Sequence, residues 1–130
     1  MLNINGTLSL KDFNTIVFEN TPVQIDEDTM LAVKASHDFL KEFAENKIIY
    51  GVNTGFGPMA QYKIEASKTK ELQYNLIRSH ASGAGDVLDE AYVRAALLAR
   101  LNTLSLGNSG IHSSVLQVMK ALLNKNIHPL

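Results

Sequence analysis

The sequence predicts an all-α fold with a short extended element near its start. Apolar residues recur every three to four positions in several separate stretches, which is the spacing of one face of a helix. Glycine, proline or helix-capping residues separate these stretches. Apolar residues make up 45% and charged residues 19% of the 130 positions, a balance typical of a globular chain. We therefore expect residues 1–130 to form a single domain.

The first third of the chain predicts two helices around an extended piece. Ser9 is a suitable N-cap for a helix over residues 10–18. Residues 23–25 are expected to be extended, and Asp26 is a second candidate N-cap. Apolar residues then recur at helical spacing to about Asn46.

Three further helices are expected after a loop that spans residues 48–64, where no helical period survives. The third helix covers residues 65–81, with an apolar side formed by Leu72, Leu76 and Ile77, and Gly83-Ala84-Gly85 stops it. The fourth covers residues 88–106 and the fifth residues 111–124. The expected capping positions are Asp86 for the fourth helix, a stop at Gly107, and Asn108 or Ser109 for the fifth.

The fourth helix is apolar almost all round, which predicts burial on every side. A chain of this size can seldom bury a helix completely, so we expect partner subunits to cover it. Its two cations, Arg94 and Arg100, are expected to pair with carboxylates or helix ends.

Charge and residue usage exclude several classes of function. The formal net charge of −1 provides no basic surface for nucleic acid. No stretch is long and apolar enough to span a membrane, and the N-terminus does not resemble a signal peptide. The absence of cysteine fits a cytoplasmic protein. The four histidines lack the spacing of metal ligands, so no metal site is expected.

The loop contains the most informative run of the sequence, in which Tyr50 opens a segment with glycines at 51, 55 and 57. Glycine allows positive φ and close approach of the backbone. The run is either a plain connector between helices or a shaped loop that holds one phenol in a fixed place. A tyrosine can act as a base when nearby donors or positive charge stabilise its phenolate.

Three ordered blocks resemble the aromatic amino acid ammonia-lyases, the family of histidine, tyrosine and phenylalanine ammonia-lyases. The blocks are Tyr50 to Ala60 (YGVNTGFGPMA), Leu72 to Gly83 (LQYNLIRSHASG) and Arg100 to Gly110 (RLNTLSLGNSG). Together the resemblance covers nearly the whole chain. It implies the N-terminal part of a helical enzyme that assembles as a homotetramer and converts an aromatic L-amino acid into a trans-acrylate and ammonia.

The resemblance also assigns roles to individual residues. It implies that Tyr50 handles the β-proton of the substrate, that Ser79 and His80 lie against the substrate side chain, and that Gly57 leaves room beside it. The Ser-His pair favours histidine as substrate, whereas the segments Pro58 to Tyr62 and Ala99 to Leu104 resemble tyrosine-acting bacterial members more closely. Phenylalanine is disfavoured because its ring would leave His80 without a polar partner. An aminomutase of the same family stays open.

The family's electrophile, 4-methylidene-imidazol-5-one (MIO), forms from an internal Ala-Ser-Gly. Ala81-Ser82-Gly83 has the same three residues, but it lies in the second block, which by resemblance contacts the substrate. We therefore expect no cofactor-forming residues in this chain and place the MIO tripeptide beyond Leu130. The expectation is an N-terminal fragment, inactive by itself. The rival hypothesis is a non-catalytic helical module that binds a small aromatic acid or a partner helix.

Overall fold

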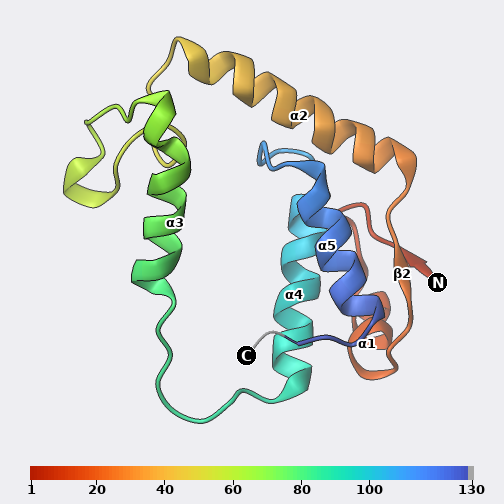
Figure 1. The fold of residues 1–130 in the computed structure, drawn as a ribbon. Helices are drawn as coiled ribbons and strands as arrows, with labels where there is room; N and C mark the ends of the chain where they lie inside the picture. Colours follow the sequence, from red (N-terminus) through yellow and green to blue (C-terminus); the bar gives the residue numbers. More distant parts are fainter. Residues whose placement is uncertain (129–130) are drawn as a thin grey trace. The chain divides into compact units, whose positions relative to one another are not determined.

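The computed structural model describes residues 1–128, and its fold is predominantly helical (Figure 1). Within these residues the regular elements are β1 (Leu2–Asn3), α1 (Leu10–Phe18), β2 (Val23–Gln24), α2 (Glu27–Glu45), α3 (Thr69–His80), α4 (Glu90–Leu104) and α5 (Ser113–Asn124). Two short 3-10 helices, Gly57–Met59 and Ala66–Lys68, lie between α2 and α3. The all-α prediction with a short extended element is confirmed.

The chain divides into two compact units. Unit 1 comprises Met1–Leu40 together with the residues from Val87 onward, and unit 2 comprises Lys41–Asp86. Helix α2 begins in unit 1, and its last turn belongs to unit 2.

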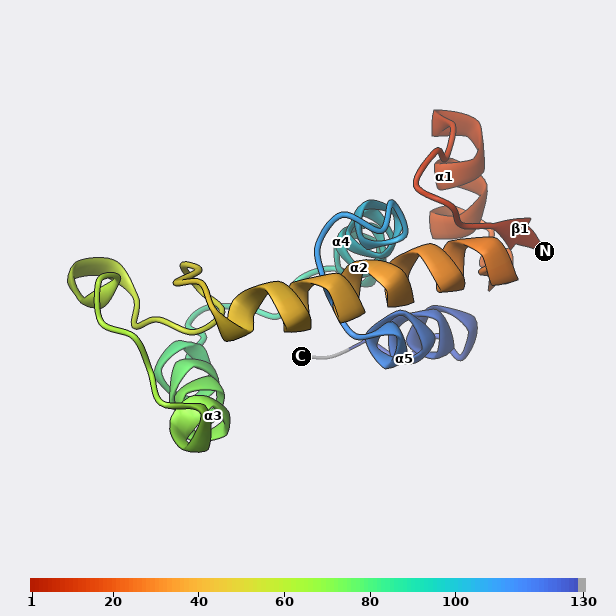
Figure 2. The same cartoon turned by 90° about the horizontal axis from the view of Figure 1, so that it is seen from above.

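Unit 1 contains the hydrophobic core. Helix α4 packs against α1 and α5, which Figure 2 shows from above. Helix α5 also packs against β2 (Figure 1). The buried apolar side chains are those of Ile4, Ile16, Val17, Val23, Val33, Leu98, Leu101, Leu104, Leu116 and Leu123. Strands β1 and β2 are parallel, with Leu2 opposite Val23. The side chain of Asn124 bonds both the N–H and the C=O of Val23 at 2.8 Å, which fixes the end of α5 to the sheet.

The two predicted N-caps of the first helices are confirmed. The Ser9 hydroxyl accepts a hydrogen bond from the Asp12 N–H at 3.1 Å. The Asp26 carboxylate accepts one from the Thr29 N–H at 2.8 Å and one from the side chain of Asn3. The bonds from Thr29, followed by the bond from Asn3, lower the pKa of Asp26 below its usual range.

Three local predictions were wrong, and strand β1 was not anticipated. Helix α4 is capped by Asp89, whose carboxylate accepts from the Ala91 N–H at 2.8 Å, and not by Asp86. Helix α5 is capped by the imidazole of His112, which accepts from Ser114 N–H at 3.2 Å, and not by Asn108 or Ser109. Helix α3 begins at Thr69, after the 3-10 helix Ala66–Lys68, and not at Glu65, whereas its end at His80 lies next to the predicted end at Ala81.

Helix α4 is buried along one side only. Leu98, Leu101 and Leu104 are buried, whereas Tyr92 is 70% exposed. The prediction of burial on every side is therefore wrong for the chain by itself, because α1 and α5 cover only the face that carries these leucines. That partner subunits cover the remaining face stays a prediction.

Unit 2 holds the glycine-rich loop and α3. Residues 54 and 63 form an antiparallel bridge, supported by bonds from Gly55 N–H to Tyr62 C=O at 3.1 Å and from Ile64 N–H to Asn53 C=O at 2.9 Å. The predicted loop from 48 to 64 is therefore a folded turn. Of the predicted apolar side of α3, Leu72 and Leu76 are half-buried, but Ile77 is exposed.

Candidate active site

Tyr50 lies five residues after the end of α2 and opens the glycine-rich loop. Its side chain is 63% exposed, and its ring meets Phe56 edge-on at a centroid distance of 6.1 Å. The hydroxyl forms no hydrogen bond within the described part of the chain. The ring of Tyr50 thus contacts Phe56, while its hydroxyl has no partner among the described residues.

Two polar side chains hold the loop around Tyr50. Asn53 accepts a hydrogen bond from the Ile49 N–H at 2.8 Å and donates to the carbonyls of Ala44 and Lys47 at 2.9 and 2.8 Å. Thr54 is fully buried; its hydroxyl accepts from the Gly51 N–H at 3.2 Å and donates to the Gly55 C=O at 2.8 Å. The sequence interpretation did not single out either residue.

The glycines of the loop serve different purposes. Gly57 has φ +56°, and a Cβ there would meet nothing within 4 Å, so open space lies beside it. At Gly55, by contrast, a Cβ would lie 2.7 Å from both the Cβ and the carbonyl oxygen of Met59. Gly55 therefore permits close packing of the backbone, while Gly57 permits a left-handed turn.

His80 is the last residue of α3 and points one ring nitrogen at its own helix. Its Nδ1 lies 2.9 Å from the Leu76 carbonyl, and the Ser79 hydroxyl donates to the same carbonyl at 2.9 Å. A carbonyl oxygen can only accept, so Nδ1 carries the proton. In the neutral ring Nε2 is then an acceptor, exposed and available to a donor group.

The predicted site residues all lie in unit 2, where the Ser79 hydroxyl lies 3.0 Å from Nδ1 of His80. Among the described residues, no hydrogen bond or ring contact joins Tyr50 to Ser79 or His80. The roles assigned to Tyr50, Ser79, His80 and Gly57 therefore stay predictions.

Ala81-Ser82-Gly83 forms an exposed connection after α3. The Ala81 N–H bonds Ile77 C=O and the Ser82 N–H bonds His80 C=O, both at 2.8 Å. A reactive electrophile requires an enclosed site that excludes water. In the chain by itself the tripeptide is not enclosed, and the formation of MIO from residues beyond Leu130 stays a prediction.

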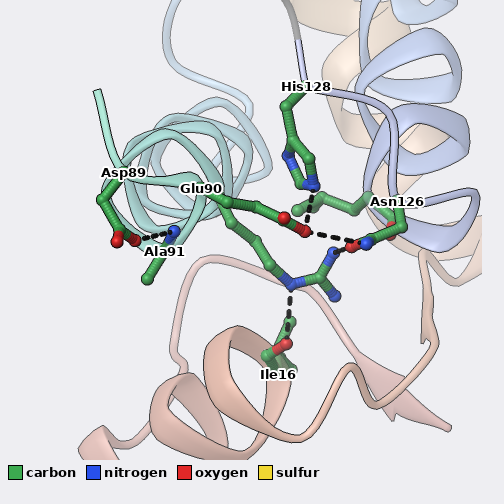
Figure 3. Close-up of polar contacts among 8 residues, drawn as sticks. Ile16, Asp89, Glu90, Ala91, Asn126 and His128 are labelled. Atoms are coloured by element: carbon green, nitrogen blue, oxygen red, sulfur yellow. Dashed lines mark hydrogen bonds and ion pairs between the residues drawn. The ribbon is translucent and has the colours of Figure 1, made fainter. Parts of the chain in front are cut away.

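Arg94 is the buried cation of unit 1, only 2% exposed. Its guanidinium donates to the carbonyl of Ile16 in α1 at 3.0 Å, to that of Leu123 in α5 at 2.9 Å and to the amide oxygen of Asn126 at 3.0 Å (Figure 3). Burial lowers the pKa of Arg94, and the Glu90 carboxylate acts in the opposite direction. A shifted pKa can mark a functional site. Here the bonds to helix carbonyls indicate a structural role, as expected from the sequence.

Glu90 continues this network toward the end of α5. Its carboxylate accepts from the Asn126 amide at 2.8 Å and lies 2.8 Å from Nε2 of His128 (Figure 3). Asn126 has φ +53°, a left-handed conformation that asparagine tolerates better than most residues. The network thus holds the turn that follows α5.

The loop between α4 and α5 is attached to α2 within unit 1. The Gly110 N–H bonds the Ser36 hydroxyl at 3.1 Å, and the Gly110 carbonyl lies 2.9 Å from Nδ1 of His37. A Cβ at Gly110 would lie 2.3 Å from a methyl carbon of Leu40. Gly110, the last residue of the third block, therefore serves the packing of this loop against α2. Within residues 1–128, no group of three His, Cys, Asp or Glu side chains could hold a metal ion.

The family model for aromatic amino acid lyases matches residues 8–130. The "Probable histidine ammonia-lyase" of Thermoplasma acidophilum is 43% identical over 99% of this chain, and the histidine ammonia-lyase of Streptococcus pyogenes serotype M5 is 41% identical over the same share. The chain therefore belongs to the aromatic amino acid lyase family. It spans about a quarter of the length of these relatives, 26% in both cases.

Solved structures of related enzymes share the fold. Tyrosine aminomutase from Streptomyces globisporus superimposes with a TM-score of 0.91 at 35% identity, over 98% of this chain and 25% of that one. The ergothioneine-degrading enzyme ergothionase from Treponema denticola gives 0.92 at 33% identity, over 98% and 26%. Histidine ammonia-lyase from Trypanosoma cruzi gives 0.80 at 27% identity, over 95% and 24%. In the described residues, no helix is long and apolar enough to cross a membrane.

Proposed function

We propose that this chain is the N-terminal part of a cytoplasmic ammonia-lyase that eliminates ammonia from an aromatic L-amino acid and yields the trans-acrylate. The observation that carries the proposal is the placement of Tyr50, whose exposed phenol stands on a loop fixed by side-chain bonds on both sides of it. The similarity to curated histidine ammonia-lyases supports the same class of reaction.

Tyr50 takes the β-proton of the substrate in this proposal. General bases act from within hydrogen-bond reach of the proton that they remove. The Tyr50 hydroxyl is free of partners among the described residues, so it can turn to a substrate carbon. Donors that stabilise its phenolate would come from the remainder of the protein or from neighbouring subunits.

His80 selects the substrate through its exposed Nε2. With the proton held on Nδ1 by the Leu76 carbonyl, Nε2 accepts from an imidazole N–H or a phenol O–H. The ring of phenylalanine offers no such donor. Histidine, which would give urocanate, is the first choice, because the curated relatives are histidine ammonia-lyases, and tyrosine, which would give coumarate, follows.

MIO, formed from an Ala-Ser-Gly outside this chain, would supply the electrophile that activates the amino group. The residues of this chain bind the ring, leave space at Gly57 and move the β-proton. A homotetramer would cover the exposed face of α4, which includes Tyr92.

The test is expression of the encoded protein at its full length, with initial rates on histidine, tyrosine and phenylalanine. We expect acrylate from histidine or tyrosine, and a preference over phenylalanine of up to ~10⁴-fold. Tyr50→Phe should lower kcat by about 10²-fold with a smaller effect on KM. His80→Phe should shift the preference toward phenylalanine. The purified 130-residue chain should form no acrylate and lack the ultraviolet absorbance of the electrophile.

A second candidate is an aminomutase, favoured by the likeness to tyrosine aminomutase. Chromatographic identification of the products together with an ammonia assay separates the two, because a mutase returns a β-amino acid and a lyase releases the acrylate and free ammonia. If the full-length protein forms neither product, the non-catalytic binding module becomes the better hypothesis.

A further inference from the structure

Both chain neighbours of Tyr50 have their N–H groups held by side chains from the same turn. Ile49 N–H bonds the Asn53 side chain at 2.8 Å, and Gly51 N–H bonds the Thr54 hydroxyl at 3.2 Å. Gly51 has φ +77°, and glycine, which lacks a Cβ, restricts its own backbone less than other residues, so the bonds to these N–H groups limit the conformations of the segment. The restraint at this tyrosine is therefore polar.

The side chain of Asn53 also bonds two carbonyls outside the turn. Its amide nitrogen donates to Ala44 C=O at 2.9 Å and Lys47 C=O at 2.8 Å, at and just beyond the last turn of α2. The last carbonyls of a helix have no partner within the helix. One side chain therefore satisfies the end of α2 and also fixes the residue before Tyr50.

We propose that Asn53 is a positioning residue for Tyr50, fixing the loop to the end of α2 so that the phenol meets the substrate at a constant place. The inference rests on the proposed function of Tyr50. Between residues 41 and 86, all of which the structure describes, no hydrophobic side chain is buried, so packing cannot replace these bonds. A displacement of a reacting group by about 1 Å can cost ~10²-fold in rate.

The kinetic test uses the full-length protein and three variants. Asn53→Ala removes all three side-chain bonds. Asn53→Asp keeps an acceptor for Ile49 N–H but replaces the two donors to carbonyls with a carboxylate that can only accept. Both should lower kcat by about 10- to 100-fold and change KM by less than about threefold. Asn46→Ala, an exposed change in the same unit, should leave both constants unaltered.

A double-mutant cycle separates positioning from general destabilisation. If Asn53 acts through Tyr50, Asn53→Ala should cost the Tyr50→Phe enzyme less than about twofold in kcat, because no phenol remains to be misplaced. An equal loss in both backgrounds would overturn the proposal, since it would show that Asn53 supports the fold alone.

Amide hydrogen exchange, followed by mass spectrometry, tests the restraint without relying on activity. Peptides covering residues 49–55 should exchange at least about tenfold faster in Asn53→Ala than in wild type or Asn46→Ala, because the bonds at Ile49 and the α2 carbonyls are lost. Unchanged exchange would overturn the restraint even in an active enzyme. A wild-type protein with no activity on any aromatic amino acid overturns the proposed function instead, and with it the positioning role.

Discussion

Different interactions stabilise the interior of unit 1 and the interior of unit 2. In unit 1, ten buried apolar side chains from α1, α2, α4, α5, strand β2 and Ile4, which follows β1, form a common core. In unit 2, the fully buried side chain is a threonine, and bonds from Asn53 and Thr54 to the backbone shape the loop. Unit 1 is packed like a scaffold, and unit 2 carries the exposed polar groups that could take part in a reaction.

This division has a physical reason. Hydrophobic burial stabilises a fold but leaves the buried side chains unavailable for chemistry. A site needs exposed polar groups, such as Tyr50 and His80, held by directional bonds. Functional loops are accordingly drawn from the parts of a protein with low local stability.

The largest expected effect comes from the core of unit 1. Leu101 is fully buried, and Leu101→Ala should lower the free energy of unfolding by about 3 kcal/mol. Leu76→Ala, at a half-buried position of α3, should cost less than about 1 kcal/mol. Urea denaturation followed by circular dichroism measures both. Equal losses at the two leucines would remove the distinction between the units.

A somewhat smaller effect is expected at Arg94. Arg94→Ala leaves the buried carbonyl of Ile16 without its donor, at a cost of about 1–3 kcal/mol, while the Leu123 carbonyl loses one of its bonds but keeps the one from the Asn126 N–H at 3.2 Å. Arg100→Ala, on the exposed side of the same helix, should change the free energy of unfolding by less than about 0.5 kcal/mol. If the two arginine variants unfold at the same urea concentration, the network of Figure 3 does not hold unit 1 together.

The positions of the helices in unit 1 could be predicted from the sequence, because apolar residues recur at helical spacing in each of them. The range 10–18 for α1 and its cap Ser9 are observed, and α4 ends at Leu104, three residues before Gly107, which has φ +72°. The cap of α4 could not be predicted, since Asp86 and Asp89 are equally suitable by residue type and only the path of the chain decides between them. Strand β1 has two residues, too few for a recognisable period.

The site could be predicted only in part. The resemblance drew attention to Tyr50 and His80, but the reasons for their placement lie in backbone contacts. Asn53 bonds Ala44, nine residues earlier, and no spacing rule for side chains anticipates a helix end capped from the following loop. The orientation of His80 depends on the Leu76 carbonyl, which is likewise absent from the pattern of side chains.

Two glycines test how closely the loop of unit 2 is packed. Gly55→Ala places a Cβ 2.7 Å from the backbone oxygen of Met59, so the turn must shift, at an expected cost of about 1–3 kcal/mol in local stability. Gly57→Ala meets no atom within 4 Å and suffers only from its φ of +56°, about 1 kcal/mol. The amide hydrogens of residues 51–64 should exchange faster in Gly55→Ala than in Gly57→Ala. The reverse order would mean that backbone conformation, and not close packing, limits this loop.

The smallest effect concerns the charge at the start of α2 in unit 1. Bonds from Thr29 and Asn3 favour the ionised form of Asp26 and lower its pKa in the folded chain. A lowered pKa contributes stability that is present above the ordinary carboxyl range and is lost as the pH falls below about 4, through the lowered value. Asp26→Asn keeps an oxygen that can accept the Thr29 N–H but cannot titrate. The stability difference between wild type and Asp26→Asn should therefore shrink on acidification, while the difference for Asp28→Asn, which lacks these bonds, should change less. Urea midpoints between pH 3 and 7 measure both, and parallel curves for the two variants would show that Thr29 and Asn3 do not favour the charged cap.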